Sequence, residues 1–159
     1  MTVRVAEMSW VHRIRKGLDE GRFCLYEQEI RPIGGIGKGQ ERRELLLRLR
    51  DESGSLVTPN SFLPAAERYG LMPLIDRWVV RRAFEIIADR KHSSRKIAGY
   101  AINLSGATVG DADFVDYVAG LFAQYDVPPT SICFEITETS AISDLDEATA
   151  FIERIRGMP

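Results

Sequence analysis

Cysteine is scarce in this 159-residue chain, which has only Cys24 and Cys133 and no CxxC pair. Two thiols cannot form the disulfide framework of a small secreted domain, and the common zinc-binding spacing is missing. We therefore expect each cysteine to be a buried thiol on the face of a strand. The low cysteine content also favours a reducing, cytoplasmic setting.

Long apolar runs and a strong net charge are missing as well. No run approaches the roughly 18 apolar residues of a membrane span, and the N-terminal residues contain no apolar stretch of signal-peptide length. The chain has 23 acidic and 21 basic side chains and a net charge of −2. Duplex nucleic acid is therefore not an expected partner, because proteins that bind it are strongly basic on one face.

Glycine clusters at residues 34–39 (GGIGKG), but this cluster matches no phosphate-binding motif. A P-loop requires GxxxxGK followed by Ser or Thr, whereas Gly39 is followed by Gln40, and GxGxxG is also missing. We interpret the segment as a flexible hairpin turn between two strands.

The composition, 45% hydrophobic and 28% charged, is typical of one folded domain. Periodicity predicts helices over residues 9–21, 62–69, 73–90, 112–125 and 144–157, and strands over 22–31, 42–50, 97–104 and 131–137. Asp111 should cap the fourth helix, and Ser143 with Asp146 should cap the last. The later strands alternate with helices, which predicts parallel strands, crossover helices and an α/β fold, while the opening hairpin adds one antiparallel strand.

Three predicted strands carry polar side chains where packing favours aliphatic ones, namely Glu44, Asn103 and Glu135. A carboxylate inside such a strand is costly unless its charge is compensated. Glu44 alone could form a salt bridge and Asn103 alone could cap a turn. Together, near the carboxyl ends of their strands, the three supply hard oxygen ligands that suit Mg²⁺ or Mn²⁺.

Several segments, in this order, resemble one known family: LYEQEI, ELLLR, PNSFLPAAERYGLMPLIDRWV, INLS and FEITE. The chain resembles the EAL family of bacterial cyclic di-GMP phosphodiesterases from about Trp10 to its last residue, with the family's namesake Glu-Ala-Leu present as Glu44-Leu45-Leu46. The resemblance implies a TIM-type barrel whose first strand is antiparallel to the rest. It also implies two divalent cations and the hydrolysis of cyclic di-GMP to linear pGpG.

The resemblance also implies roles for individual residues. Glu44, Asn103 and Glu135 would be metal ligands, with Glu44 as the catalytic residue, while Arg48 would contact a substrate phosphate and Gln28 would reach the bound nucleotide. Glu138 is expected to begin a helix instead. The segment before the first strand resembles the lead-in that often follows a GGDEF domain, so a GGDEF or sensor domain is an expected partner in the parent protein.

The chain is shorter than the family domain of about 250 residues, the usual size of such a barrel. We expect a lead-in helix over residues 1–21 and an incomplete EAL domain over 22–159, a partial barrel that stops after about the fourth strand. Because the family's later Asp-Asp-Phe-Gly motif is missing, we expect no useful hydrolysis by this chain. An unpaired fourth strand predicts self-association, and the alternative function is a sensor that binds cyclic di-GMP without cleaving it.

Overall fold

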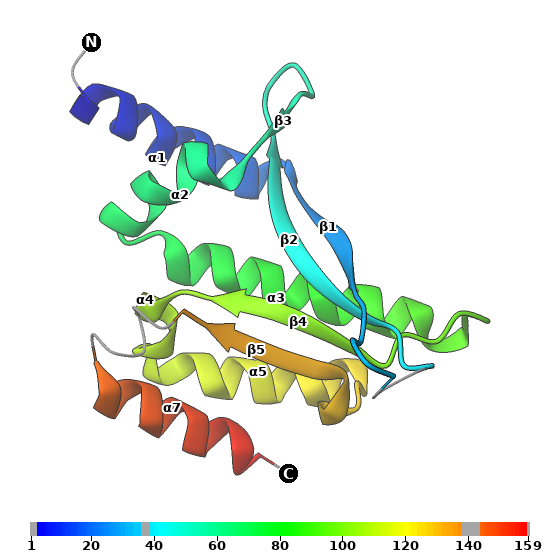
Figure 1. The fold of residues 1–159 in the computed structure, drawn as a ribbon. Helices are drawn as coiled ribbons and strands as arrows, with labels where there is room; N and C mark the ends of the chain where they lie inside the picture. The colour runs from blue at the N-terminus through cyan, green and yellow to red at the C-terminus, as the bar shows by residue number, and fades with distance from the viewer. Residues whose placement is uncertain (1–2, 36–38, 138–143, 159) are drawn as a thin grey trace.

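The computed structural model describes residues 3–35, 39–137 and 144–158, which form one sheet with helices packed against it (Figure 1). The helices are α1 (Val3–Asp19), α2 (Pro59–Arg68), α3 (Met72–Asp89), α4 (Gly106–Val109), α5 (Ala112–Tyr125) and α7 (Leu145–Arg156), with 3₁₀ turns at Arg90–His92 and Pro129–Ser131. The strands are β1 (Phe23–Ile30), β2 (Arg42–Arg50), β3 (Leu56–Val57), β4 (Gly99–Leu104) and β5 (Ile132–Ile136). Every predicted helix and strand is present.

The strands are ordered β1-β2-β4-β5, with the two-residue β3 paired to β2. β1 and β2 form an antiparallel hairpin, while β2, β4 and β5 are mutually parallel. Helices α3 and α5 make the crossovers between the parallel strands (Figure 1). This arrangement confirms the α/β fold with one antiparallel first strand, because parallel neighbours cannot be joined by a tight turn.

The core lies between the helices and one side of the sheet, which we call the covered face. Alternate strand residues point to it, including Leu45, Leu49 and Ile102, which are at most 3% exposed. Phe114 of α5 contacts Phe134 of β5, with ring centroids 6.4 Å apart. Burial of these side chains supplies the main driving force for folding.

The predicted hairpin turn is confirmed, since residues 31–41 join the antiparallel strands β1 and β2. Gly34, Gly35 and Gly39 have φ angles of 76°, 83° and 89°, a region that glycine enters without steric cost. Residues 36–38 lie outside the described part of the chain.

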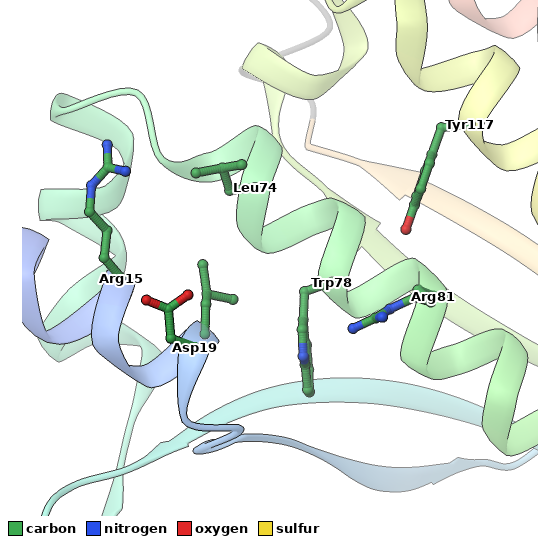
Figure 2. A pocket seen from close by; sticks show the side chains of 7 residues that line it. Arg15, Asp19, Leu74, Trp78, Arg81 and Tyr117 are labelled. Carbon is green, nitrogen blue, oxygen red and sulfur yellow. The ribbon is translucent and has the colours of Figure 1, made fainter.

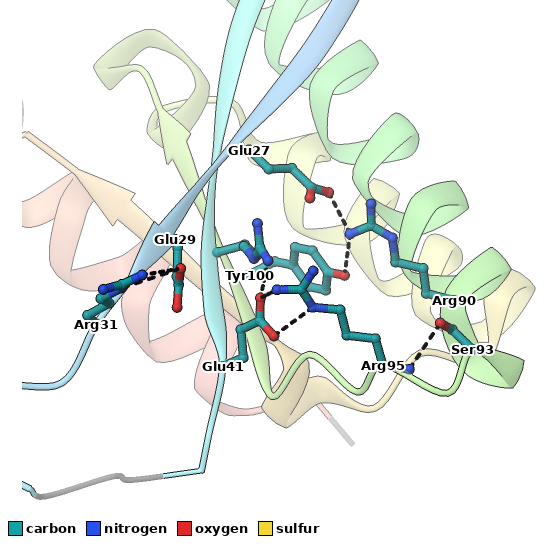
Figure 3. A network of polar contacts seen from close by, with 9 residues as sticks. Glu27, Glu29, Arg31, Glu41, Arg90, Ser93, Arg95 and Tyr100 are labelled. Atoms are coloured by element: carbon teal, nitrogen blue, oxygen red, sulfur yellow. Dashed lines mark hydrogen bonds and ion pairs between the residues drawn. The ribbon is translucent and has the colours of Figure 1, made fainter.

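A polar network fastens the turn end of this hairpin to the segment between α3 and β4 (Figure 3). Arg95 donates to both carboxylate oxygens of Glu41, at 2.9 and 2.7 Å. Arg90 donates to Glu27 Oε1 at 2.6 Å and to the Tyr100 hydroxyl at 2.9 Å. The hairpin is therefore held near its turn by ion pairs and along its length by the sheet.

Helix ends differ from the predictions in ways that local chemistry explains. Asp111 caps α5 as expected, because its Oδ1 accepts from the Asp113 N–H at 3.0 Å. Ser143 lies outside the described residues, and the cap of α7 is Asp144, which accepts from the Glu147 N–H at 3.0 Å. α1 begins at Val3, well before the predicted residue 9. The periodicity missed its first turns because their apolar side chains are exposed and form no apolar stripe.

No helix in the described ranges combines the length and the apolar content needed to cross a bilayer.

Candidate functional site

The predicted site residues share the side of the sheet opposite the covered face. We call this side the open face, and it carries Gln28, Glu44, Arg48, Asn103 and Glu135. Gln28, Asn103 and Glu135 are exposed, while Glu44 and Arg48 are half-buried. The structure therefore brings all five predicted side chains to one surface.

Pairing of the strands sets the spacing between these side chains. Gln28 lies opposite Glu44 in the β1–β2 hairpin, and Asn103 lies opposite Glu135 between β4 and β5. Directly paired residues in a sheet have Cβ atoms about 5 Å apart. Two neighbouring pairs of polar side chains therefore project from the same region of the open face.

A hydrogen bond connects the two pairs across the sheet. Asn103 Nδ2 donates to Glu44 Oε1 at 3.1 Å, although the residue of β4 opposite Glu44 is Ala101. The bond is thus a diagonal contact, which the small Ala101 side chain leaves room for. Because the amide uses its nitrogen in this contact, its oxygen is free to point elsewhere as an acceptor or ligand.

The expected position near a carboxyl end of the strand is wrong for Glu44. Asn103 is the fifth of six residues in β4 and Glu135 the fourth of five in β5. Glu44, by contrast, is the third of nine residues in β2. The reason is that β2 starts level with β4, with Arg42 opposite Gly99, and then continues past the end of β4.

Arg48 lies farther along the open face. Four residues of extended strand place its Cα about 13 Å from that of Glu44. Arg48 Nη1 donates to the Leu47 carbonyl at 2.7 Å, and the guanidinium carbon lies 5.9 Å from the centre of the Tyr26 ring. The positive charge is therefore separated from the two carboxylates along the strand.

Tyr26 also lies on the open face, and the motifs of the sequence predict no role for it. It lies on β1 between Cys24 and Gln28 in the alternation and is 41% exposed. The signal available in the sequence was its shared strand face with Gln28.

The donor set of the open face fits a hard cation better than a soft one. No group of three or more histidine, cysteine or acidic side chains gathers in the described part of the chain. Glu44 and Glu135 supply carboxylate oxygens and Asn103 an amide oxygen, which suit Mg²⁺ or Mn²⁺. Glu138 lies outside the described residues.

Both cysteines were expected to be buried, and this expectation is wrong. Cys24 is half-buried and Cys133 is exposed. Cys24 lies opposite Arg48, and Cys133 lies opposite Ala101. Both therefore share the open face, which explains their exposure.

A groove over α3, lined also by residues of α1 and α5, lies away from this surface (Figure 2). Its volume is about 600 Å³, and its lining residues are Arg15, Leu18, Asp19, Leu74, Trp78, Arg81 and Tyr117. Only one carboxylate, Asp19, is among them. This groove therefore lacks the convergent acidic and amide groups that the open face provides.

Comparison with known proteins identifies the family. Residues 12–158 match the EAL domain. The chain is 37% identical over 147 residues to Cyclic di-GMP phosphodiesterase PdeB of Shewanella oneidensis, and 31% identical over 150 residues to Cyclic di-GMP phosphodiesterase PdeF of Escherichia coli. These matches cover 92% and 94% of this chain but 17% and 19% of the two relatives.

The fold agrees with a solved structure of the same kind. The EAL domain of FimX from Pseudomonas aeruginosa, bound to c-di-GMP, superposes with a TM-score of 0.84 at 27% identity, covering 92% of this chain and 57% of that chain. EAL domains have a TIM-barrel fold, so the sheet of β1, β2, β4 and β5 and its helices correspond to part of such a barrel. The chain belongs to the EAL domain family.

Proposed function

We propose that this chain carries part of the active site of a cyclic di-GMP phosphodiesterase, which cleaves one phosphodiester bond to give linear pGpG. The observation that carries the proposal is the cluster of Glu44, Asn103 and Glu135 on the open face, with Asn103 bonded to Glu44. Family membership and the phosphodiesterase relatives support the substrate class. The proposed substrate is a bacterial second messenger, so the proposed compartment is the cytoplasm.

In this proposal Glu44, Asn103 and Glu135 bind divalent cations, Mg²⁺ or Mn²⁺. When bound, a pair of such ions supplies Lewis acidity, activating a water molecule and neutralising charge at the phosphodiester. Glu44 is the proposed catalytic residue, because it is the half-buried carboxylate of the three and its Oε1 is already oriented by Asn103. Orientation of this kind reduces the reorganisation needed during reaction.

Arg48 and Gln28 are the proposed contacts to substrate. A guanidinium has five N–H donors, and Arg48 directs one of them to the Leu47 carbonyl. The others can donate to a phosphate oxygen, for which arginine has the matching geometry. Gln28, exposed and opposite Glu44, can hydrogen-bond a nucleotide beside the cluster.

We further propose that the 159-residue chain binds its ligands but turns substrate over slowly. Two six-coordinate cations need about twelve ligand positions, and the proposed ligands on the open face are three side chains. Water molecules would fill the remaining positions, and the geometry for in-line displacement would be loosely defined.

Calorimetry with cyclic di-GMP tests this proposal. The wild-type chain should bind cyclic di-GMP in Mn²⁺, and Arg48→Ala should weaken binding about tenfold or more, since a hydrogen bond to a charged group contributes about 1.5–3 kcal/mol. Arg81→Ala, which removes an exposed arginine in the groove over α3, is the matched control and should bind as the wild type does. Chromatography of the same mixtures measures pGpG release.

The outcomes separate the candidate functions. Binding that needs Mn²⁺ and is weakened by Arg48→Ala supports the phosphodiesterase site. Equal binding in Mn²⁺ and in EDTA supports a sensor that binds cyclic di-GMP without hydrolysing it. Absence of heat under both conditions contradicts both functions, and rapid release of pGpG contradicts slow turnover.

Self-association through β5 is a separate proposal. Within the described residues β5 pairs on one side only, with β4. The free edge of a strand presents backbone N–H and C=O groups that can pair with a second chain. Light scattering should give a mass that rises with concentration, whereas a constant monomer mass would contradict the proposal.

A further inference from the structure

Asp76 of α3 is a buried carboxylate that the proposed chemistry does not use. It is 3% exposed, and among the described residues its surroundings contain no compensating cation. Burial raises the pKa of this carboxyl, while hydrogen bonds from Ser105 and Thr108 oppose the shift. A carboxylate in such a place is costly unless donors satisfy it.

Three donors converge on one oxygen of Asp76. Its Oδ2 accepts from the Ser105 N–H at 2.9 Å, from Ser105 Oγ at 2.8 Å and from Thr108 Oγ1 at 2.6 Å. All of them belong to the short segment that follows β4. Asp76 therefore fastens the end of that strand to the middle of the core, since its helix neighbours Ile75 and Val79 are buried.

The fastened segment is next to the candidate site. Ser105 caps α4, where its Oγ also accepts from the Thr108 N–H at 3.3 Å. Ser105 follows Asn103 by two residues, with the buried Leu104 between them. A single buried residue therefore separates Ser105 from Asn103, so a shift of Ser105 should also shift Asn103.

We propose that Asp76 is a positioning residue, which fixes the end of β4 so that the Asn103 amide stays in contact with Glu44. Its effect on ligand binding rests on the proposed function, but its effect on Asn103 does not. An aspartate suits this place because an ionised carboxylate oxygen can accept several hydrogen bonds and has no donor to misplace. The residue acts through Ser105 and does not itself reach the open face.

Nuclear magnetic resonance of side-chain amides reads the position of Asn103 directly. The chain has two asparagines, Asn60 and Asn103, and three glutamines, so its side-chain amide spectrum is simple. The signals of Asn103 are assigned by their loss in Asn103→Asp. Asn60 lies in the exposed first turn of α2 and is the internal reference.

Three variants weaken the hydrogen bonds between Asp76 and the Ser105–Thr108 segment to different degrees. Asp76→Ala removes the acceptor, Asp76→Asn retains one acceptor oxygen of similar size, and Thr108→Val removes a single donor. We expect the Asn103 signals to be displaced most in Asp76→Ala and less in the other two. If Asp76→Ala does not fold, the two milder variants decide.

Asp111→Asn is the control for a merely structural effect. It weakens a helix cap and the ion pair with Arg77 at 3.1 Å, but it does not touch β4. Its Asn103 signals should stay at the wild-type position even though its unfolding midpoint falls. Unchanged Asn103 signals in folded Asp76→Asn and Thr108→Val, or an equal displacement in Asp111→Asn, would overturn the proposal.

Metal titration links this result to the proposed function while keeping the two separable. With Mn²⁺, Asp76→Asn should raise the dissociation constant about tenfold, the effect typical of residues that orient ligands. If the wild type binds no Mn²⁺, the proposed metal site is contradicted, and the displacement of the Asn103 signals alone decides the role of Asp76. If Asp76→Asn binds Mn²⁺ as tightly as the wild type, the positioning role is contradicted.

Discussion

The two faces of the sheet are built from alternating residues of the same strands, yet their surroundings are opposite. On the covered face Leu45 and Ile102 are at most 3% exposed and pack against helices. Their sequence neighbours Glu44 and Asn103 lie on the open face and bond to each other. Buried apolar and accessible polar side chains thus alternate along each of these strands, as the two-residue period of a strand allows.

This division means that the polar side chains add little to the stability of the fold. The exposed side chains of Asn103 and Glu135 keep their solvation, so neither carries the desolvation cost of a buried polar group. Packing therefore does not account for their presence on parallel strands, whereas the proposed ligand binding does. Four predictions follow the contrast from its largest consequence to its smallest.

Substitutions of two neighbouring residues on β4 should show the largest difference, in their effect on the free energy of unfolding. Ile102→Ala creates a cavity in the core and should lower the free energy of unfolding by about 2–5 kcal/mol. Asn103→Ala changes an exposed side chain and should alter it by about 0.5 kcal/mol or less. Urea denaturation measures both, and equal losses would mean that the open face is buried in the folded protein.

Removal of a charge from the open face should instead affect metal binding. Glu44→Gln should weaken Mn²⁺ binding at least about tenfold, because even residues that only orient ligands contribute that much. Glu29→Gln removes an exposed carboxylate near the hairpin turn and is the matched control. Mn²⁺ titration followed by electron paramagnetic resonance checks this prediction, and equal binding by both variants would exclude Glu44 as a ligand.

Asp76 should make stability depend on pH in a definite direction. Its pKa is raised above the ordinary 3.8 by burial, so the folded state binds the proton more tightly than the unfolded state does. The free energy of unfolding of the wild type should therefore fall as pH rises from about 3.8 to the raised value. Asp76→Asn lacks this contribution, so its free energy of unfolding relative to the wild type should rise over the same window. If the difference in free energy of unfolding between Asp76→Asn and the wild type is independent of pH, the raised pKa of Asp76 is contradicted.

The ion pairs near the hairpin turn should have the smallest effect. The hydrogen bond from Arg95, and to a smaller extent that from Arg43, lowers the pKa of Glu41 below 4.5. The stabilisation from this contact is therefore present above pH 4.5 and is lost as pH falls through the lowered value. Arg95→Ala should reduce the unfolding midpoint slightly at neutral pH, since exposed pairs contribute little. In acid the unfolding midpoints of Arg95→Ala and the wild type should become equal. A difference in midpoint that is the same at every pH would contradict a contribution from the Arg95–Glu41 ion pair.

Strong periodicity made most of the fold predictable from the sequence. The alternation in RRELLLRLR, interrupted at Leu46, predicts β2 with its observed bounds, and the Asp111 cap marks the start of α5. The short elements β3 and α4 were missed, because two or four residues are too few to show a period.

The site was predictable in its residues but less so in its geometry. Unexpected polar side chains on strands indicated Glu44, Asn103 and Glu135, and the structure places them on one face. Glu44 lies near the start of β2 because this strand begins level with β4 and continues past its end, and the pairing of β2 with β4 is not recorded by a pattern within either strand. Asp76 was overlooked, although it interrupts the buried stripe of Met72, Ile75 and Val79 at helical spacing, which was a usable signal.

Paramagnetic broadening by Mn²⁺ tests most directly whether Glu44, Asn103 and Glu135 bind a common ion. Mn²⁺ is added in small steps to the ¹⁵N-labelled chain. The side-chain amide of Asn103 and the backbone amides of Glu44 and Glu135 should broaden first, while the side-chain amide of Asn60 stays sharp. Broadening centred on another acidic region, such as the loop of Asp51 and Glu52, or no selective broadening at all, would contradict the metal site.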